Sequence, residues 1–476
     1  MRAARLLFLQ GRHDEADGFF ELARRLKHVE PESTDFATYD LSRDPLVVEP
    51  VSGSPADLRL EADDGAEICR ALRTVPSTLN PLKARTYEDF VVAELLFDPL
   101  VHIDYQGHYQ INPTVVEQIN VSDEELITTL TLRSEARWHD GEPITAADVV
   151  FSWGQLPESD SSRAALSMVV ALDERRIAFH HNERAAEPKW DLVFPIVPKH
   201  VFDVLRTKHP DQNHLSSLFS ADPVGNGPYR FVDADEDRVI LQRWEDYSGS
   251  RPHMKRVVFK IYEDGHDRIR ALADGDVHEV ELSPAEFVWD VNGTAFIGKI
   301  AKIYADRWSY DYICWNNDAN KTPFFGDSRV RRAMTMAMNL GEIPERRYGI
   351  RYGTSTGIYH PSSWMASSNF KPLEYDSSTA QDLLKQAGWL RGSDGVRSKG
   401  GRRFDFSLLV HEASKETRLL LSEIVYELQA IGVNMQLEVA SHAEFWTRIR
   451  AHDFDAFVYS VIDARHPDAS RRRWIT

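Results

Sequence analysis

The sequence predicts an α/β protein with two large domains, and three observations support this prediction. The chain has 476 residues, more than a single hydrophobic core usually organises. Between residue 66 and about residue 300, short strand-like runs alternate with turn signals, as in antiparallel-rich α+β domains. After residue 300, a strand, a helix and a second strand follow one another at 404–439, and such units nearly always have parallel strands.

Composition and charge indicate a globular protein with an acidic surface. Hydrophobic residues make up 42% of the chain and aromatic residues 11%, which is too many for a disordered chain. The formal net charge is −18, so we expect no nucleic-acid partner and no direct contact with an anionic membrane, because phosphate repels such a surface. Cys69 and Cys314 lie far apart in the sequence, which argues against a disulfide framework or a thiolate zinc site.

Residues 1–60 are predicted to form one amphipathic helix and a linker. Apolar side chains fall on one helical face within 11–29, and 31–58 mix Pro, Ser, Asp and Gly. Only four consecutive apolar residues, at 6–9, follow the basic start, fewer than the ~7–15 of a secretory core. No later run approaches the ~18 apolar residues that span a bilayer. We therefore expect no signal peptide in the chain as given.

The first large domain is predicted to be rich in short strands. A strand-like stretch at 66–82 precedes a helix or long turn at 87–101, and alternating runs follow at 115–133. Three more strands are predicted from RIAFHH (176–181), RVILQRW (238–244) and RVVFKIY (256–262).

The stretch TLRSEARWHDGEPITAADVVFSW, at 131–153, predicts a strand, a tight corner and a helix start. Thr145 can accept a hydrogen bond from the amide three residues on, and Asp148 lies in the first turn, near the positive end of the helix dipole. The corner at 139–141 ends in a glycine that can take a positive φ. A catalytic role would need His139 and Asp140 to act together, but adjacent side chains point apart. We interpret the corner as a structural joint.

The second large domain, at about 300–463, is predicted to be α/β. Asp327 and Asp376 can each cap a helix whose apolar residues share one face. A strand at 404–410, a helix and a strand at 433–439 then form the strand-helix-strand unit.

Several stretches, in this order, resemble the landmarks of the family 5 extracellular solute-binding proteins, the peptide- and nickel-binding receptors of ABC importers. The resemblance runs from about residue 66 to residue 468. It rests on LRSEARWHDGEPITAADVVFSW (132–153), IVPKHVF (196–202), DPVGNGPYRF (222–231), WNNDANKTPFFGDSRVRRAMTMAMN (315–339), YDSSTAQDLLKQAGW (375–389) and DGVRSKGGRRFDFSLLV (394–410).

The resemblance implies a two-lobed, periplasmic-binding-protein-like fold of type II. Lobe I would span 61–300, with an extra α+β subdomain inserted at about 85–220, and lobe II would span 301–463. Residues 464–476 would begin a second hinge crossing. Residues 1–60 do not resemble the family, and the leader and the carboxyl-terminal return segment of its members are expected to be missing.

The function that the resemblance implies is that of a receptor, not an enzyme. It would capture an oligopeptide between its lobes and deliver it to a membrane permease on the periplasmic or extracellular side of a bacterial membrane. Expected partners are a peptide, the permease and its ATPase subunits, with no cofactor and a monomeric receptor. Two alternatives remain open: a fold reused for a regulatory or scaffolding role, and a nickel-chelate receptor.

Two charged residues are candidate ligand contacts. In peptide-binding relatives, an aspartate shortly after a strand of the type found at 454–456 pairs with the ligand's α-ammonium, and Asp463 is the nearest match here. Asp463 could equally cap the turn before Pro467. Arg307, at the first hinge crossing, is a candidate for recognising the ligand's carboxylate, and a solvated salt bridge is the alternative.

Further candidates are aromatic residues of the first crossing and an acidic pair in lobe I. The aromatic residues are Trp308, Tyr310, Tyr312 and Trp315, for which alternating core packing is the favoured alternative. Glu88 and Asp89 begin an apolar stretch that resembles a pocket wall, and they are secondary candidates.

Two motifs could suggest a catalytic or a metal site, and we interpret both as structural. Ser355 lies in GTSTG (353–357), but IYHPSSWM (358–365) follows it, with an early proline and without the small-residue helix of a nucleophile elbow. His180 and His181 would face opposite ways on a strand, which is poor geometry for one metal.

Overall fold

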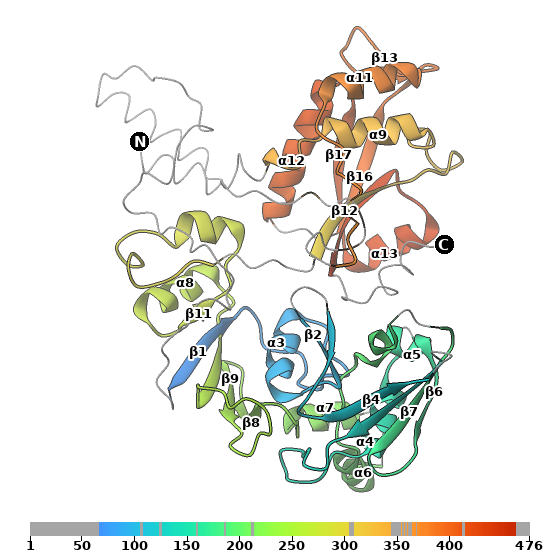
Figure 1. Ribbon diagram of the computed structural model, residues 1–476. Helices are drawn as coiled ribbons and strands as arrows, with labels where there is room; N and C mark the ends of the chain where they lie inside the picture. Colours follow the sequence, from blue (N-terminus) through green and yellow to red (C-terminus); the bar gives the residue numbers. More distant parts are fainter. Residues whose placement is uncertain are drawn as a thin grey trace.

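The computed structural model forms two lobes (Figure 1). It describes residues 66–104, 108–122, 126–158, 160–184, 187–210, 214–303, 309–343, 354, 357, 359, 364–367, 369–411 and 415–462. The predictions for 1–60, for 464–476 and for Ser355 lie outside these residues. No helix in the described part is long and apolar enough to cross a membrane.

A five-stranded mixed sheet organises lobe I. Its order is β11-β1-β10-β9-β8, and β1 runs parallel to both β10 and β11. The strands are β1 (Glu67–Leu72), β8 (Tyr229–Ala234), β9 (Arg238–Arg243), β10 (Arg256–Ile261) and β11 (Glu279–Val280).

Helices cover both faces of this sheet because successive strand residues point to opposite sides. Phe259 packs with apolar residues of α3 (Tyr87–Leu96), α6 (Lys199–Lys208) and α7 (Leu215–Ala221). Its neighbour Val258 packs on the other face, with residues of α8 (Gly265–Asp274). A short helix, η6 (Glu286–Asp290), follows β11.

The inserted subdomain is an antiparallel sheet of order β4-β5-β7-β6 with its own core. Its elements are β2 (Val101–Ile103), β3 (Tyr109–Ile111), β4 (Val116–Val121), β5 (Ile127–Leu132), α4 (Ala146–Gln155), α5 (Ser161–Ala165), β6 (Leu166–Ala171), β7 (Arg176–His181) and η4 (Pro188–Leu192). The buried core residues run from Leu100 to Ile196. The insertion is therefore narrower than the predicted 85–220, because α3, α6 and α7 pack on the lobe I sheet instead.

Lobe II contains a four-stranded sheet of order β12-β18-β16-β17. Strands β16, β17 and β18 are parallel, and β12 is antiparallel to β18. The elements are β12 (Ser309–Trp315), α9 (Ser328–Ala337), α11 (Ser377–Gln386), β13 (Leu390–Arg391), β14 (Arg397–Lys399), β15 (Arg402–Arg403), β16 (Asp405–His411), α12 (Lys415–Ala430), β17 (Asn434–Ala440), α13 (His442–Ala451) and β18 (Ala456–Ile462).

Three predictions for lobe II are confirmed. The carboxylate of Asp327 accepts from the amide of Arg329 at 2.9 Å, which caps α9. The carboxylate of Asp376 accepts from the amide of Thr379 at 2.9 Å, which caps α11. Strands β16 and β17, joined by α12, are parallel as expected for a strand-helix-strand unit.

The corner before α4 is a structural joint, as predicted. Gly141 has φ +90°, and the Asp148 carboxylate accepts from the amide and the hydroxyl of Thr145, both at 2.8 Å. The ring of His139 bonds the backbone of Gly225 and Gly227, whereas the Asp140 carboxylate lies 2.7 Å from Nε2 of His200. The bonds of His139 hold the corner against the loop before β8.

Candidate functional site

The carboxyl ends of the parallel strands of lobe II meet at one edge of the sheet. Strands β16, β17 and β18 end there at His411, Ala440 and Ile462, and the antiparallel β12 begins there at Ser309, which pairs with Ile462. In Figure 1 this edge lies on the side of lobe II nearest lobe I. Open α/β sheets bind ligands outside the carboxyl ends of their strands, so this edge is the candidate site.

Three predicted ligand contacts flank this edge in the sequence but lie outside the described residues. Trp308 immediately precedes Ser309, Arg307 comes one residue earlier, and Asp463 immediately follows Ile462. The described ladder ends at the pair Ser309–Ile462, so the backbones that lead into these segments start from adjacent positions. Their roles remain proposals.

The aromatic residues of β12 separate onto two faces of the sheet. Trp315 belongs to the core of lobe II, with ring centroids 4.7 Å from Phe325 and 6.1 Å from Phe406. Tyr310 and Tyr312 lie on the opposite face, their centroids 6.3 Å apart. Core packing, the favoured alternative, therefore describes Trp315 and also Tyr312, whose ring packs against Phe457 in a second core cluster, and Tyr310 is the aromatic candidate that remains.

A row of half-buried rings continues from these tyrosines along the face covered by α13. The ring of Tyr312 lies 6.5 Å from that of Tyr459, and the ring of Tyr459 lies 5.2 Å from that of Trp446, a residue of α13. The row ends at His442, whose ring lies 6.4 Å from Trp446. An aromatic surface therefore extends across the sheet to the start of α13.

Two histidines meet at the carboxyl edge, and the sequence reasoning missed them. Nε2 of His411 lies 3.0 Å from Nδ1 of His442, and the two rings are nearly perpendicular. His411 ends β16 and His442 begins α13, directly after β17. The signal was present in the sequence, because each histidine comes at the carboxyl end of a predicted parallel strand.

Lobe I has a corresponding edge, where β1, β10 and β11 end at Leu72, Ile261 and Val280. Arg73 is the first residue after β1, and its guanidinium lies 3.7 Å from the carboxylate of Glu286. The same carboxylate pairs at 2.6 Å with Arg268, which is almost wholly buried. The Glu286 carboxylate therefore lies near two guanidiniums.

The acidic pair of lobe I, Glu88 and Asp89, is buried, and Asp89 has a structural role. Asp89 is fully buried, and its carboxylate accepts from the amides of Ser77, Thr78, Arg85 and Thr86 and from the hydroxyl of Ser77. Burial alone would raise its pKa, but these hydrogen bonds outweigh burial and hold the pKa below its usual value. Asp89 thus shapes the loop between β1 and α3 and has no free acceptor for a ligand. Glu88 is buried as well.

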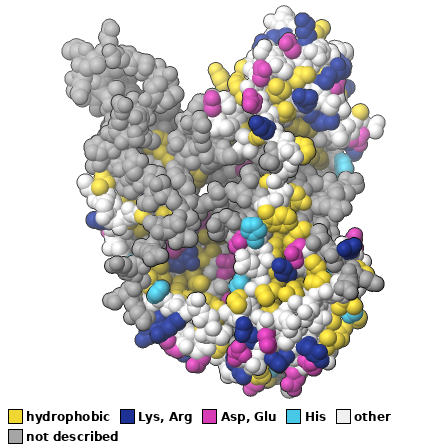
Figure 2. Space-filling model, in the orientation of Figure 1, with side chains coloured by type: hydrophobic (Ala, Val, Ile, Leu, Met, Phe, Trp, Pro, Cys, Tyr) yellow, Lys and Arg dark blue, Asp and Glu magenta, His cyan; other side chains and the backbone are white. Residues whose placement is uncertain are grey.

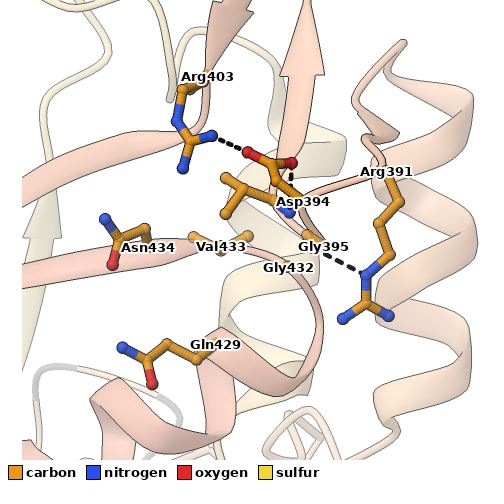
Figure 3. A pocket seen from close by; sticks show the side chains of 9 residues that line it. Arg391, Asp394, Gly395, Arg403, Gln429, Gly432, Val433 and Asn434 are labelled. Atoms are coloured by element: carbon orange, nitrogen blue, oxygen red, sulfur yellow. Dashed lines mark hydrogen bonds and ion pairs between the residues drawn. The ribbon is translucent and has the colours of Figure 1, made fainter.

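An open pocket in lobe II lies between the β13–β15 hairpins and the turn that joins α12 to β17 (Figure 3). Its two guanidiniums are used internally. Arg403 pairs with Asp394 and with Asp405, and Arg391 donates to the carbonyls of Gly395 and Ala430 at 2.9 Å each. The pocket is the seam where the hairpins dock on the lobe.

Basic side chains are concentrated on the same part of lobe II, although the whole chain is acidic. Figure 2 shows Lys and Arg side chains gathered on the upper part of this lobe. The segment 385–403 holds Lys385, Arg391, Arg397, Lys399, Arg402 and Arg403 against a single acidic residue, Asp394. This surface lies away from the carboxyl edge of the sheet (Figure 1).

A buried hydroxyl-imidazole-carboxylate chain occurs in the inserted subdomain. Thr128 Oγ1 lies 2.9 Å from Nε2 of His181, and Nδ1 of His181 lies 2.7 Å from the carboxylate of Asp191. All three side chains are buried, so a substrate cannot reach the hydroxyl. The chain of hydrogen bonds is structural. Within the described residues, no group of three or more His, Cys, Asp and Glu side chains is arranged to hold a metal ion.

Comparison with known proteins identifies related sequences. The family model of the bacterial extracellular solute-binding proteins, family 5, matches residues 110–475. The oligopeptide-binding protein AppA of Bacillus subtilis is 23% identical over 418 residues, which cover 83% of this chain and 73% of AppA. A putative ABC transporter peptide-binding protein of Brucella ovis is 26% identical over 366 residues, which cover 75% of this chain and 65% of that protein.

Solved structures share the fold. The structure of AppA from Bacillus subtilis in complex with a nonapeptide has a TM-score of 0.63 at 22% identity and covers 86% of this chain and 81% of AppA. NikZ from Campylobacter jejuni in complex with Ni(L-His) has a TM-score of 0.66 at 22% identity and covers 85% of this chain and 78% of NikZ. These likenesses confirm the predicted two-lobed α/β fold.

Proposed function

Because the chain belongs to the bacterial extracellular solute-binding proteins of family 5, we propose that it binds a short peptide between its two lobes as the receptor of an ABC importer. The observation that carries this proposal is the pair of sheet edges. In lobe I and in lobe II, parallel strands end at an edge that provides polar and aromatic groups. The AppA structure, which has the same fold, holds a nonapeptide.

The proposed contacts divide by charge. Asp463 takes the peptide's α-ammonium, because a buried ammonium is stable only beside a carboxylate. Arg307 is a candidate partner for the peptide's carboxylate. Tyr310 offers a half-buried ring for an apolar side chain. Selectivity among peptides then follows from pocket volume and from bridging water, because all peptides share the same backbone groups.

Delivery to a permease is part of the same proposal. Closure of the two lobes around the peptide creates a surface that differs from that of the open form, so the permease can distinguish loaded from empty receptor. The receptor then acts as a monomer on the periplasmic or extracellular side, and the ATPase subunits drive transport.

A library of di- to pentapeptides tests peptide binding. A ligand that binds only the folded state raises the melting temperature. We expect shifts of several degrees for particular peptides, and we expect Asp463→Ala to abolish them while leaving the unliganded melting temperature unchanged. A chain that melts cooperatively and shows no shift with any peptide would refute the proposal and favour a non-transport role for the fold.

A nickel chelate is a second candidate ligand, favoured by the histidine pair. Metal–imidazole bonds of ~2.0–2.1 Å place two neighbouring ligand nitrogens about 2.9–3.3 Å apart. The nitrogens of His411 and His442 are 3.0 Å apart, within this range, where they now share a hydrogen bond that a metal ion would replace. Nickel(II) with and without free histidine should then raise the melting temperature of the native protein but not of His411→Gln. An equal response of both proteins, or none, would exclude this candidate.

A further inference from the structure

We propose that Arg73 is the residue of lobe I that binds the carboxylate of the ligand, which makes the receptor selective for peptides with a free carboxyl terminus. This inference rests on the proposed peptide-binding function. It starts from the position of Arg73, directly after Leu72, where β1 ends at the carboxyl edge of the sheet.

The nearby carboxylate of Glu286 does not use up the charge of Arg73. One oxygen of Glu286 accepts from the guanidinium of Arg268 at 2.6 Å, and the other accepts from the amide of Ser283 at 2.7 Å. Arg73 approaches the second oxygen only to 3.7 Å, beyond hydrogen-bonding distance. Glu286 is thus paired mainly with Arg268, and Arg73 makes no hydrogen bond to it, although Asp264 and Asp290 add negative charge to the same cluster.

The burial of the two arginines supports different roles. The side chain of Arg268 is 3% exposed and that of Arg73 is 45% exposed. Burial lowers the pKa of Arg268, and the like charge of Arg73 lowers it further although the pair with Glu286 opposes both effects. Arg268 is therefore a fixed structural cation, whereas Arg73 has room to turn its planar guanidinium toward a carboxylate.

Arg73 also stands out from the other groups at this edge. The residues that follow β10 include Glu263 and Asp264, and the residue that follows β11 is Glu281. Lys302, a nearby cation in sequence after η6, is buried and donates to the Phe287 carbonyl and the Asn292 amide oxygen. An anionic ligand group near the carboxyl ends of these strands therefore meets Arg73 as the accessible cation of the described edge.

The test uses calorimetry on the full chain with a peptide found by thermal shift, in its free-acid form and as its carboxyl-terminal amide. Removing one charge-assisted contact costs about 10- to 100-fold in affinity. We expect the amide to bind the native protein weaker by this factor. Arg73→Gln should weaken the free acid to the level of the amide and leave the amide unchanged, and Arg73→Lys should keep part of the preference.

Arg70→Gln is the matched control. Arg70 lies three residues earlier on β1 and pairs with Glu279 at 2.6 Å. We expect it to leave the preference for the free acid intact. Equal affinities of the free acid and the amide for the native protein would overturn the role of Arg73 while leaving peptide binding established. Loss of the preference in Arg307→Gln but not in Arg73→Gln would also overturn it. If no peptide binds at all, the proposed function fails and this inference falls with it.

Discussion

His139 shows how one side chain can hold two parts of the chain together only in its neutral form. The amide of Gly225 donates to Nδ1 at 3.1 Å, and Nε2 donates to the carbonyl of Gly227 at 3.0 Å. These partners select the tautomer with its proton on Nε2. A proton on Nδ1 would remove the first bond and place a charge in a poorly solvated site. Burial accordingly lowers the pKa of His139 to about 4.

This pKa predicts a loss of stability in mild acid. Above pH ~6.5 both folded and unfolded states hold a neutral imidazole, and between about 6.5 and 4 only the unfolded state binds the proton. The folded state should therefore lose up to roughly 3 kcal/mol as the pH falls through this window. We expect His139→Gln to flatten this part of the stability curve measured by urea unfolding. The exposed His253→Gln should follow the native curve, and a native-like slope in His139→Gln would contradict the assignment.

A conservative substitution of Asp89 is expected to lower the free energy of unfolding strongly. Asp89→Asn keeps the size of the side chain but replaces one acceptor oxygen with an NH2 group that would face amide donors. We expect a loss of about 2–4 kcal/mol in the free energy of unfolding at pH 7. Because the pKa of Asp89 is lowered by its bonds, the difference should shrink as the pH falls below ~3.9. Glu94→Gln, an exposed carboxylate on the same helix, is the control and should change stability little.

At the scale of secondary-structure elements, the loop before β8 connects the end of α3 to the corner at His139. The amides of Asn226 and Gly227 both donate to the carbonyl of Leu96, and the Asn226 side chain bonds the backbone of Asp98. A Cβ on Gly225 would lie 1.9 Å from the carbonyl oxygen of Leu96. The backbone of the loop and the end of α3 can therefore approach this closely only with glycine.

Two glycine substitutions with opposite expected effects on stability test this contact. Gly225→Ala should destabilise lobe I by about 3 kcal/mol or more, because backbone atoms must move. Gly154→Ala is the matched change: Gly154 lies within α4 with no neighbour near its Cβ position, so alanine should stabilise by about 0.5–1 kcal/mol. Thermal unfolding measures both. Similar effects of the two changes would contradict the close approach.

Local elements could be predicted from the sequence, whereas long-range partnerships could not. Asp327, Asp376 and Gly141 lie within a few residues of the groups they organise, so their roles follow from turn and cap chemistry. The contacts of Asp89 need the folded loop from Ser77 to Thr86, and Arg73 meets Glu286 only after β1 pairs with β10 and β11. The family resemblance supplied the two lobes, but it could not show that Trp315 faces the core.

At the scale of the whole molecule, a contact between aromatic rings links the lobes. Trp190 belongs to η4 of the inserted subdomain, and Trp364 belongs to the stretch between α9 and α11 of lobe II. Their ring centroids are 5.5 Å apart at an interplanar angle of 32°. Trp190 also contacts Tyr109 at 6.1 Å, so it is anchored within the subdomain. The pair therefore stabilises the arrangement in which the subdomain and lobe II approach each other.

Trp364→Ala should shift the equilibrium toward more open arrangements. Such aromatic pairs contribute about 0.5–1.5 kcal/mol, which corresponds to a roughly 2- to 12-fold change in the ratio of closed to open molecules. We expect a larger radius of gyration by X-ray scattering and a ligand affinity reduced by no more than the same factor, because a ligand that needs the closed form must also supply the lost contact energy. Tyr426→Ala, which removes a 72% exposed ring from α12, is the control and should leave both unchanged. If scattering from Trp364→Ala superimposes on that of the native protein, the pair does not govern closure.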